Sequence, residues 1–172
     1  MNAMPRFCLL IALSLFCVAP VHAENWPGWR GMRHDGTTTE SGFPLQWSAN
    51  ENIAWKTAIP GSGHSSPIVW NDRVFVTSCL EKEQQRILYC IDRLSGKIAW
   101  QQVVVTAPLE KKHGLNSYAS STPATDGQHI YVSFFAKPRM VVICYTFDGK
   151  EVWRKSPGEF HSQHGFCAPP IG

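Results

Sequence analysis

Four histidines of this sequence could each bind a metal ion or contact an anionic ligand. They are His64, His113, His161 and His164. Imidazole binds metal ions, and it contacts anionic groups when protonated. No Asp or Glu recurs at matching positions beside these histidines, and their spacing from the adjoining Ser/Ala-rich motifs is uneven. We therefore treat all four as candidate ligand contacts and assign no metal ligand, with metal binding and ordinary loop hydrogen bonding kept as alternatives.

The segment around the second of these histidines offers several kinds of contact at once. His113-Gly114-Leu115-Asn116-Ser117-Tyr118 places an amide at Asn116 and an aromatic face at Tyr118 in a short stretch. Binding residues often lie on such loops. Asn116 and Tyr118 are therefore further candidate ligand contacts, and the alternative is that they only order the loop.

Serine pairs precede two of the apolar stretches, at Ser65-Ser66 and Ser120-Ser121. A hydrolase nucleophile would require a Gly-x-Ser-x-Gly elbow or a comparable arrangement, and that motif does not occur. Hydroxyls at such positions commonly hydrogen-bond the loop backbone. We predict no catalytic residue.

The elements that must position these residues belong to a unit that ends in tryptophan. Ser65-Ser66-Pro67 leads through apolar stretches to Trp100, and Ser121-Thr122-Pro123 leads likewise to Trp153. Ala168-Pro169-Pro170-Ile171 resembles the start of a third copy. Repeats of roughly 40 to 50 residues are typical of propeller blades and solenoids, in which each unit is stabilised by its neighbours.

The sequence of each complete unit predicts four short antiparallel strands, because runs rich in Val, Ile, Tyr and Phe alternate with turn dipeptides. The predicted strands are 67–70, 73–78, 86–92 and 97–103 in the first unit, and 123–125, 129–134, 140–146 and 150–155 in the second. Gly96 and Gly149 precede the last strand of each unit, where a turn favours a positive φ. Unbroken apolar runs indicate sheets that are covered on both faces. The predicted fold is an all-β propeller of four-stranded antiparallel blades, an incomplete ring with about two full blades.

Several motifs resemble one family. They are Trp26-Pro27-x-Trp29-Arg30-Gly31, Gly63-His64-Ser65-Ser66-Pro67, Leu88-Tyr89-Cys90-Ile91-Asp92-x-x-Ser95-Gly96-Lys97-x-x-Trp100 and Tyr118-Ala119-Ser120-Ser121-Thr122-Pro123. These motifs resemble the PQQ-like β-propeller repeat proteins, exported bacterial proteins related in fold to quinoprotein dehydrogenases and to the outer-membrane assembly factor BamB. The resemblance implies that Trp55, Trp100 and Trp153 dock one blade on the next. It also implies a ring of about seven or eight blades, closed by an N-terminal strand.

The chain divides accordingly into three parts. Residues 1–23 are predicted as a signal peptide, 24–46 as an irregular N-terminal arm and 47–172 as the propeller. Within the propeller we expect a ring-closing strand that carries Trp55 at 47–60, a first blade at 61–104, a second blade at 118–156 and the start of a third at 165–172. Since two blades cannot close a ring, we interpret the sequence as an N-terminal fragment.

The N-terminus has the three regions of an export signal. Arg6 supplies positive charge, 7–18 is mostly apolar, and Val21-His22-Ala23 offers small residues for cleavage after Ala23. The apolar run is shorter than the roughly 20 residues that span a bilayer. We expect an exported protein, periplasmic or secreted, without a transmembrane segment. Lipidation is the alternative, but Phe16 precedes Cys17, where a lipobox has a small residue.

Net charge and cysteine positions bear on two further questions, whether the protein binds nucleic acid and whether it contains disulfide bonds. The formal net charge of +3 falls to +2 without Arg6, and Lys/Arg do not cluster as in nucleic-acid-binding proteins, so no nucleic-acid partner is expected. Cys90 and Cys144 occupy matching apolar strands and are predicted to be buried thiols. A single incidental bridge, most simply Cys79 with Cys90, is the alternative.

The predicted function is an exported, non-catalytic binding or scaffolding module with a protein, peptide or carbohydrate partner. The alternative implied by the resemblance is a PQQ-dependent quinoprotein oxidoreductase, a dehydrogenase that holds PQQ with calcium. Such enzymes typically carry adjacent cysteines and a carboxylate-rich calcium site. Neither pattern occurs in this sequence, so we expect no cofactor.

Overall fold

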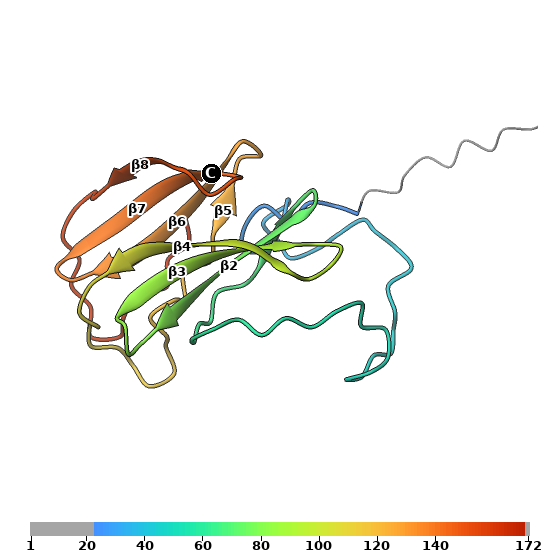
Figure 1. Cartoon of the computed structure of the whole chain (residues 1–172), viewed down its shortest axis with the longest axis horizontal. Helices are drawn as coiled ribbons and strands as arrows, with labels where there is room; N and C mark the ends of the chain where they lie inside the picture. The colour runs from blue at the N-terminus through green and yellow to red at the C-terminus, as the bar shows by residue number, and fades with distance from the viewer. Residues whose placement is uncertain (1–22, 171–172) are drawn as a thin grey trace, which may run out of the picture.

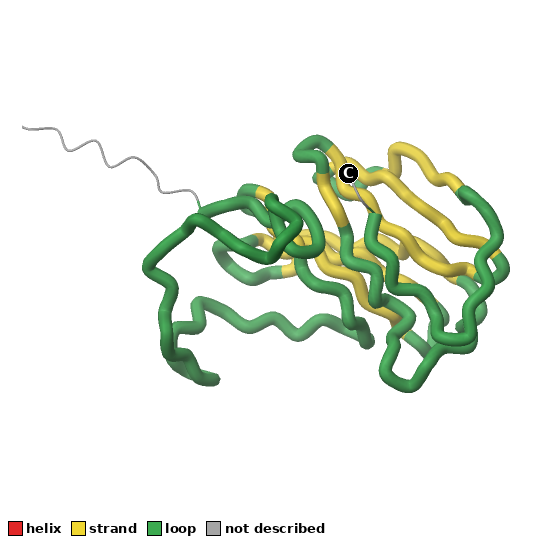
Figure 2. Tube along the Cα trace, turned by 180° about the vertical axis from the view of Figure 1, so that it is seen from behind, coloured by secondary structure: helices red, strands yellow, loops and turns green. Residues whose placement is uncertain are grey.

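A computed structural model describes residues 23–170, and this described part consists of eight β-strands, turns and loops without a helix (Figure 2). The predicted signal peptide lies, except for Ala23, outside the described residues. The same holds for residues 171–172 at the predicted start of a third blade.

The first sheet is formed by β1 (Ile68–Trp70), β2 (Arg73–Leu80), β3 (Gln85–Asp92) and β4 (Ile98–Thr106). The strands are paired in that order and all pairs are antiparallel (Figure 1). These are the four strands predicted for the first unit, with ends that shift by a few residues. Asn71 adopts a φ of 49° in the tight turn between β1 and β2, a conformation that Asn tolerates better than most residues.

The second sheet repeats the first with β5 (Ala124–Thr125), β6 (His129–Ala136), β7 (Arg139–Thr146) and β8 (Glu151–Lys155). Its strands are again antiparallel and in chain order. The register repeats as well: Phe75 pairs with Cys90 in the first sheet, and Tyr131 pairs with Cys144 in the second. The fold is therefore an all-β, incomplete propeller with two four-stranded blades, as predicted.

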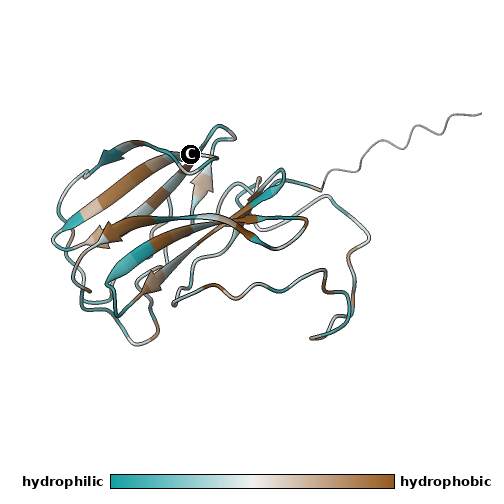
Figure 3. Cartoon of the chain, in the orientation of Figure 1, coloured by the Kyte–Doolittle hydropathy of each residue, from teal (hydrophilic) through white to brown (hydrophobic). Residues whose placement is uncertain are grey.

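The hydrophobic core lies between the two blades, where β4 faces β6. Ile68, Phe75 and Leu88 of the first sheet and Ile130 and Phe134 of the second are essentially inaccessible to solvent. Apolar residues accordingly concentrate in the strands rather than in the loops (Figure 3). One blade thus covers the face of the other, which explains why the strand sequences are apolar in unbroken runs.

The N-terminal arm contacts the first strand of each blade, β1 and β5. Trp26 forms a two-bond antiparallel bridge with Val69 of β1, with N···O distances of 2.7 and 2.9 Å. The amide of Thr125 in β5 donates to Pro27 O at 2.8 Å. The arm is therefore irregular but packed, and it connects the two blades at their edge strands β1 and β5.

Residues 47–60, where we expect a ring-closing strand, are irregular in the structure. Side chains, rather than a strand ladder, hold this segment against the first blade. Trp55 Nε1 donates to Arg93 O at 2.8 Å, and Thr57 Oγ1 donates to Gly96 O. Among the described residues, no strand edge pairs with the main chain of this segment, so the extended pairing that defines a strand is not formed.

No helix in residues 23–170 is long and apolar enough to cross a membrane.

Cysteines in the described residues are all free thiols. Cys90 and Cys144 are buried, as predicted. The alternative bridge between Cys79 and Cys90 is not formed, because Cys79 pairs with Arg86 and Cys90 with Phe75, several rungs apart in the ladder between β2 and β3. Cys167 is exposed.

This difference in exposure predicts selective thiol chemistry. Burial raises the pKa of Cys79 and of Cys90 to about 11, so both remain protonated and unreactive at pH 8. We expect iodoacetamide at that pH to modify Cys167 and to leave Cys79, Cys90 and Cys144 unmodified until the protein unfolds. Peptide mass mapping of native and unfolded protein checks this, and rapid native labelling of Cys90 would contradict the core packing.

Candidate ligand-binding site

Trp55 and Trp100, two of the three tryptophans that the resemblance implies dock one blade on the next, each cover a glycine turn of the following blade. Trp55 lies over Gly96, where an added Cβ would come within 2.5 Å of the indole. Trp100 lies over Gly149 in the same way, with a corresponding distance of 3.0 Å, and its Nε1 donates to Phe147 O at 3.1 Å. Both glycines have positive φ angles of 69° and 85°. The tight approach and the backbone conformation together explain why glycine occupies these turns.

Hydroxyl groups at matching positions join successive repeats. Thr77 Oγ1 in β2 donates to Ser121 O at 3.2 Å, and Ser133 Oγ in β6 donates to Ala168 O at 3.1 Å. Ser121 Oγ contacts Ser133 Oγ at 2.8 Å and also donates to Ala168 O. The serine at the start of the second unit is therefore held in contacts between repeats.

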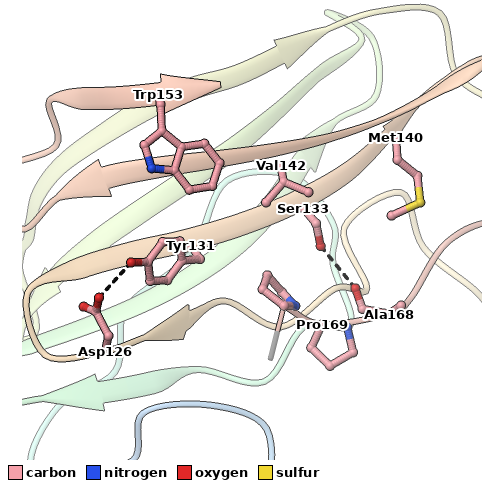
Figure 4. Close-up of a pocket in the computed structure, with 9 residues that line it drawn as sticks. Asp126, Tyr131, Ser133, Met140, Val142, Trp153, Ala168 and Pro169 are labelled. Carbon is pink, nitrogen blue, oxygen red and sulfur yellow. Dashed lines mark hydrogen bonds between the residues drawn. The ribbon is translucent and has the colours of Figure 1, made fainter. Parts of the chain in front are cut away.

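A cavity of about 500 Å³ lies on the far face of the second blade (Figure 4). Tyr131, Val142 and Trp153 line it together with Pro169. The strand registers show that the first three match Phe75, Leu88 and Trp100, the surface of the first blade that the second blade covers. This face has the composition of a surface for packing between blades, so we do not select it as the ligand site.

Two of the four predicted histidines come together. The His113 and His164 rings lie 5.9 Å apart between centroids, and His113 N donates to His164 O at 3.3 Å. Asn116 Nδ2 also donates to His164 O, at 2.7 Å, and its Oδ1 accepts from Ser120 Oγ at 2.6 Å. In this arrangement the Asn116 amide ties one loop to another.

The other predicted site residues lie apart from this pair. His64 is exposed, and its main-chain N–H donates to Ala119 O at 3.0 Å. His161 is 80% exposed, with Nε2 at 3.9 Å from Glu159 Oε2. Tyr118 lies beneath Lys112, whose Nζ is 5.0 Å from the ring centroid, and burial raises the pKa of its phenol. The four candidate histidines are therefore not gathered at one site. No group of three or more His, Cys, Asp or Glu side chains within 23–170 is arranged to hold a metal ion.

A buried ion pair joins the first blade to the connection that follows it, and no sequence pattern predicted this pair. Arg86 in β3 is fully buried, and its Nη2 donates to Glu110 Oε2, a carboxylate on the connection between the blades. Arg86 Nη1 donates to Ala107 O at 2.6 Å. Arg86 Nε has no hydrogen-bond partner among the described residues. The sequence did not single out Arg86, because it lies next to the start of the mostly apolar strand β3, where an exposed charge is the usual expectation.

The strongest candidate for a ligand site is a cavity of about 580 Å³ between the N-terminal arm and β5. Its walls combine aromatic and apolar side chains with a few polar groups. They are Pro27, Gly28, Trp29, Met32, His34, Ala124, Thr125, Asp126, Pro169 and Pro170. A mostly apolar concave site with a few polar groups is the usual form of a ligand pocket.

Two wall residues of this arm cavity present apolar surface to solvent. Trp29 is 51% exposed and Met32 is 45% exposed. The Arg30 guanidinium lies 4.4 Å from the Trp29 ring centroid, an exposed cation–π contact. Exposed indole of this kind is typical of recognition surfaces.

Asp126 is the acidic group of the arm cavity, and it is already engaged in a turn. Its Oδ1 accepts from the amides of Gln128 and His129 at 2.8 and 2.7 Å, and its Oδ2 accepts from the Tyr131 hydroxyl at 2.7 Å. These hydrogen bonds hold the pKa of Asp126 below its usual range despite partial burial. The same contact raises the pKa of Tyr131 to about 12. The carboxylate therefore supplies a fixed negative charge at the edge of the cavity.

Sequence reasoning did not select this site. Trp29 appeared in the irregular arm and in one motif of the family resemblance, without a role as a ligand contact. His34 and Asp126 stand far from one another in the chain. A signal for this site is present in residues 26–31, which contain two Trp, one Pro and two Gly. Two tryptophans within six residues are unusual for a solvated linker and indicate a packed or ligand-binding segment.

Comparison with known families identifies the repeat. A family model described as outer membrane protein assembly factor BamB matches the chain twice, over residues 38–131 and 84–169. No curated protein matches the chain.

Proposed function

Because the chain belongs to the BamB-like family of PQQ-repeat propellers, we propose that it is an exported, non-catalytic binding module. Its ligand is a protein or peptide segment with an apolar side chain, held in the arm cavity. The single observation that carries this proposal is the cavity itself, whose walls include the exposed Trp29 and Met32 and a fixed carboxylate at Asp126.

The chemistry of the walls supports peptide binding over the other partners. Proline and methionine give apolar surface without directional donors, which suits an aliphatic or aromatic side chain. The family description names a factor for outer membrane protein assembly, and protein binding is the corresponding role that we propose for this chain. Export is supported by the N-terminal sequence pattern that ends at Ala23.

The Trp29→Ala variant tests the proposed site. We expect it to weaken binding by about tenfold or more, because truncation of a central aromatic residue at an interface commonly costs over 1 kcal/mol. Synthetic peptides on an array identify binders, and fluorescence polarisation of a labelled binder then measures affinity for both proteins.

Trp47→Ala is the matched control. Trp47 is 69% exposed and lies outside the cavity walls, so this variant should bind as the parent does. Equal losses of peptide affinity in Trp29→Ala and Trp47→Ala would contradict the assignment of the arm cavity as the binding site. Binding to an oligosaccharide array, without any peptide binder, would replace the peptide ligand with a carbohydrate.

A further inference from the structure

Glu24 is bound to a later part of the N-terminal arm, residues 33–40, through both its main chain and its side chain. Its N–H donates to Glu40 Oε1. Its carboxylate accepts from Arg33 Nη1 at 2.8 Å and from Thr38 Oγ1. These contacts lower the pKa of the Glu24 carboxyl, so it stays ionised near neutral pH. The interlocked segment 24–40 includes Met32 and His34, two walls of the arm cavity.

The next residues continue this anchoring onto both blades. Asn25 Oδ1 accepts from the amide of Asn71 at 2.7 Å, next to the bridge between Trp26 and Val69. Pro27 O accepts from Thr125 N at 2.8 Å. Glu24 therefore stands at the start of a continuous series of contacts that positions one side of the cavity.

The bond between Ala23 and Glu24 is the one at which the sequence predicts cleavage. In the uncleaved chain, Glu24 offers Glu40 a neutral amide N–H. Hydrolysis by an export peptidase adds hydroxide to the Ala23 carbonyl carbon and hydrogen to the Glu24 nitrogen, which then takes up a proton. The product is an α-ammonium group, whose usual pKa is about 7.7 to 8.0.

We propose that the Glu40 carboxylate is the receptor for the new N-terminal ammonium, so that processing after Ala23 strengthens the contact between Glu24 and Glu40 that closes segment 24–40 of the arm. Cleavage converts an amide–carboxylate hydrogen bond into an ammonium–carboxylate ion pair at the same atoms. The acceptor is ionised in both forms, and the new full positive charge on the donor adds Coulombic attraction to the bond. This inference rests on the proposed export and on the cleavage position. It does not require that the cavity bind a peptide.

Three charged groups determine the titration of the new terminus. The Glu40 and Glu24 carboxylates favour the ammonium form, and the Arg33 guanidinium opposes it. We expect the two carboxylates to raise the pKa of the α-amino group above its usual range. A raised pKa means that the extra stability is fully present below the unfolded-state pKa and is lost as the pH rises through the folded-state pKa.

The test compares two forms of the chain that differ by one residue. The first begins at Glu24, with its terminus read by sequencing, and the second retains Ala23 and therefore keeps an amide at Glu24. Hydrogen exchange of the Trp26 amide, which bonds to Val69 O, measures opening of the arm. At pH 6.5 we expect exchange about threefold to tenfold slower in the form that begins at Glu24.

Variants assign the effect to the proposed receptor. Glu40→Gln should remove the difference between the two forms, mainly by speeding exchange in the one that begins at Glu24. Glu51→Gln, which removes an exposed carboxylate outside segment 24–40, should leave the difference unchanged. Equal exchange in the two parent forms, or an equal effect of Glu40→Gln on both, would overturn the inference.

Separate measurements test the proposed function and the ammonium site. Sequencing of the exported chain reports whether cleavage occurs after Ala23, and a cut elsewhere overturns the processing step. Peptide titration of each form reports on the arm cavity separately, so loss of peptide binding with an intact exchange difference would remove the ligand and retain the ammonium site.

Discussion

Replacing Trp100 with alanine is expected to lower the free energy of unfolding by about 3 to 5 kcal/mol, the range for truncation of a large aromatic residue in a packed interface. The indole covers Gly149 of the next blade, contacts the Phe75 ring at a centroid distance of 5.9 Å and donates to Phe147 O. Its removal leaves a void between the blades and an unpaired carbonyl. Urea denaturation followed by circular dichroism measures the change.

Trp153→Ala provides the matched control. Trp153 occupies the same register position in the second blade, paired with Cys144 as Trp100 is paired with Cys90. In the described part of the chain it covers no glycine turn, and its aromatic neighbour is Tyr131 at 6.0 Å. We expect a loss of less than half that for Trp100→Ala. Equal losses would show that the tryptophan stabilises its own blade and not the contact between blades.

Replacing Glu110 with alanine is expected to cost about 3 to 5 kcal/mol of unfolding free energy, because it leaves the Arg86 guanidinium buried without its counter-ion. Arg86 is fully buried and the Glu110 side chain is 3% exposed, so water cannot replace the lost carboxylate. Chemical denaturation measures the loss. An exposed pair is the comparison: Glu151→Ala, which breaks the contact with Arg154 at 2.7 Å, should cost less than about 1 kcal/mol.

The second blade suggests how to remove the Arg86 pair without this cost. Met140 occupies the register position of Arg86, since Phe135 pairs with Met140 as Cys79 pairs with Arg86. Arg86→Met combined with Glu110→Leu should therefore recover at least half of the loss caused by Glu110→Ala. If the double variant is as unstable as Glu110→Ala, the charged pair itself is required for the packing of the blades.

Repeated local signals made the strands and the fold class predictable from the sequence. Val/Ile/Tyr-rich runs and turn dipeptides such as Asn71-Asp72 act between near neighbours in the chain, so their pattern specifies the hairpins directly. The ring-closing strand expected at 47–60 stays a prediction, because no strand edge pairs with this segment among the described residues. A strand needs a partner edge, and a pattern such as Ile53-Ala54-Trp55 carries no information on whether that edge is available.

Site residues were harder to predict because a loop's sequence does not encode which other loop it meets. His113 and His164 come together through main-chain contacts between two connections, whereas His64 and His161 lie apart. Trp29 and Asp126 form one cavity only because the arm pairs with β1 and β5. These contacts join residues that are distant in the chain.

Short-range patterns repeated along the chain were enough to predict the two blades, their matching place for tryptophan at Trp100 and Trp153, the buried thiols at Cys90 and Cys144, and the family. The arm cavity, the buried ion pair of Arg86 with Glu110 and the contact of Glu24 with Glu40 became visible only in the folded chain. One cause accounts for all three. Burial, pairing of charges and the shape of a cavity depend on which surfaces meet after the blades pack, and composition and spacing do not specify those encounters.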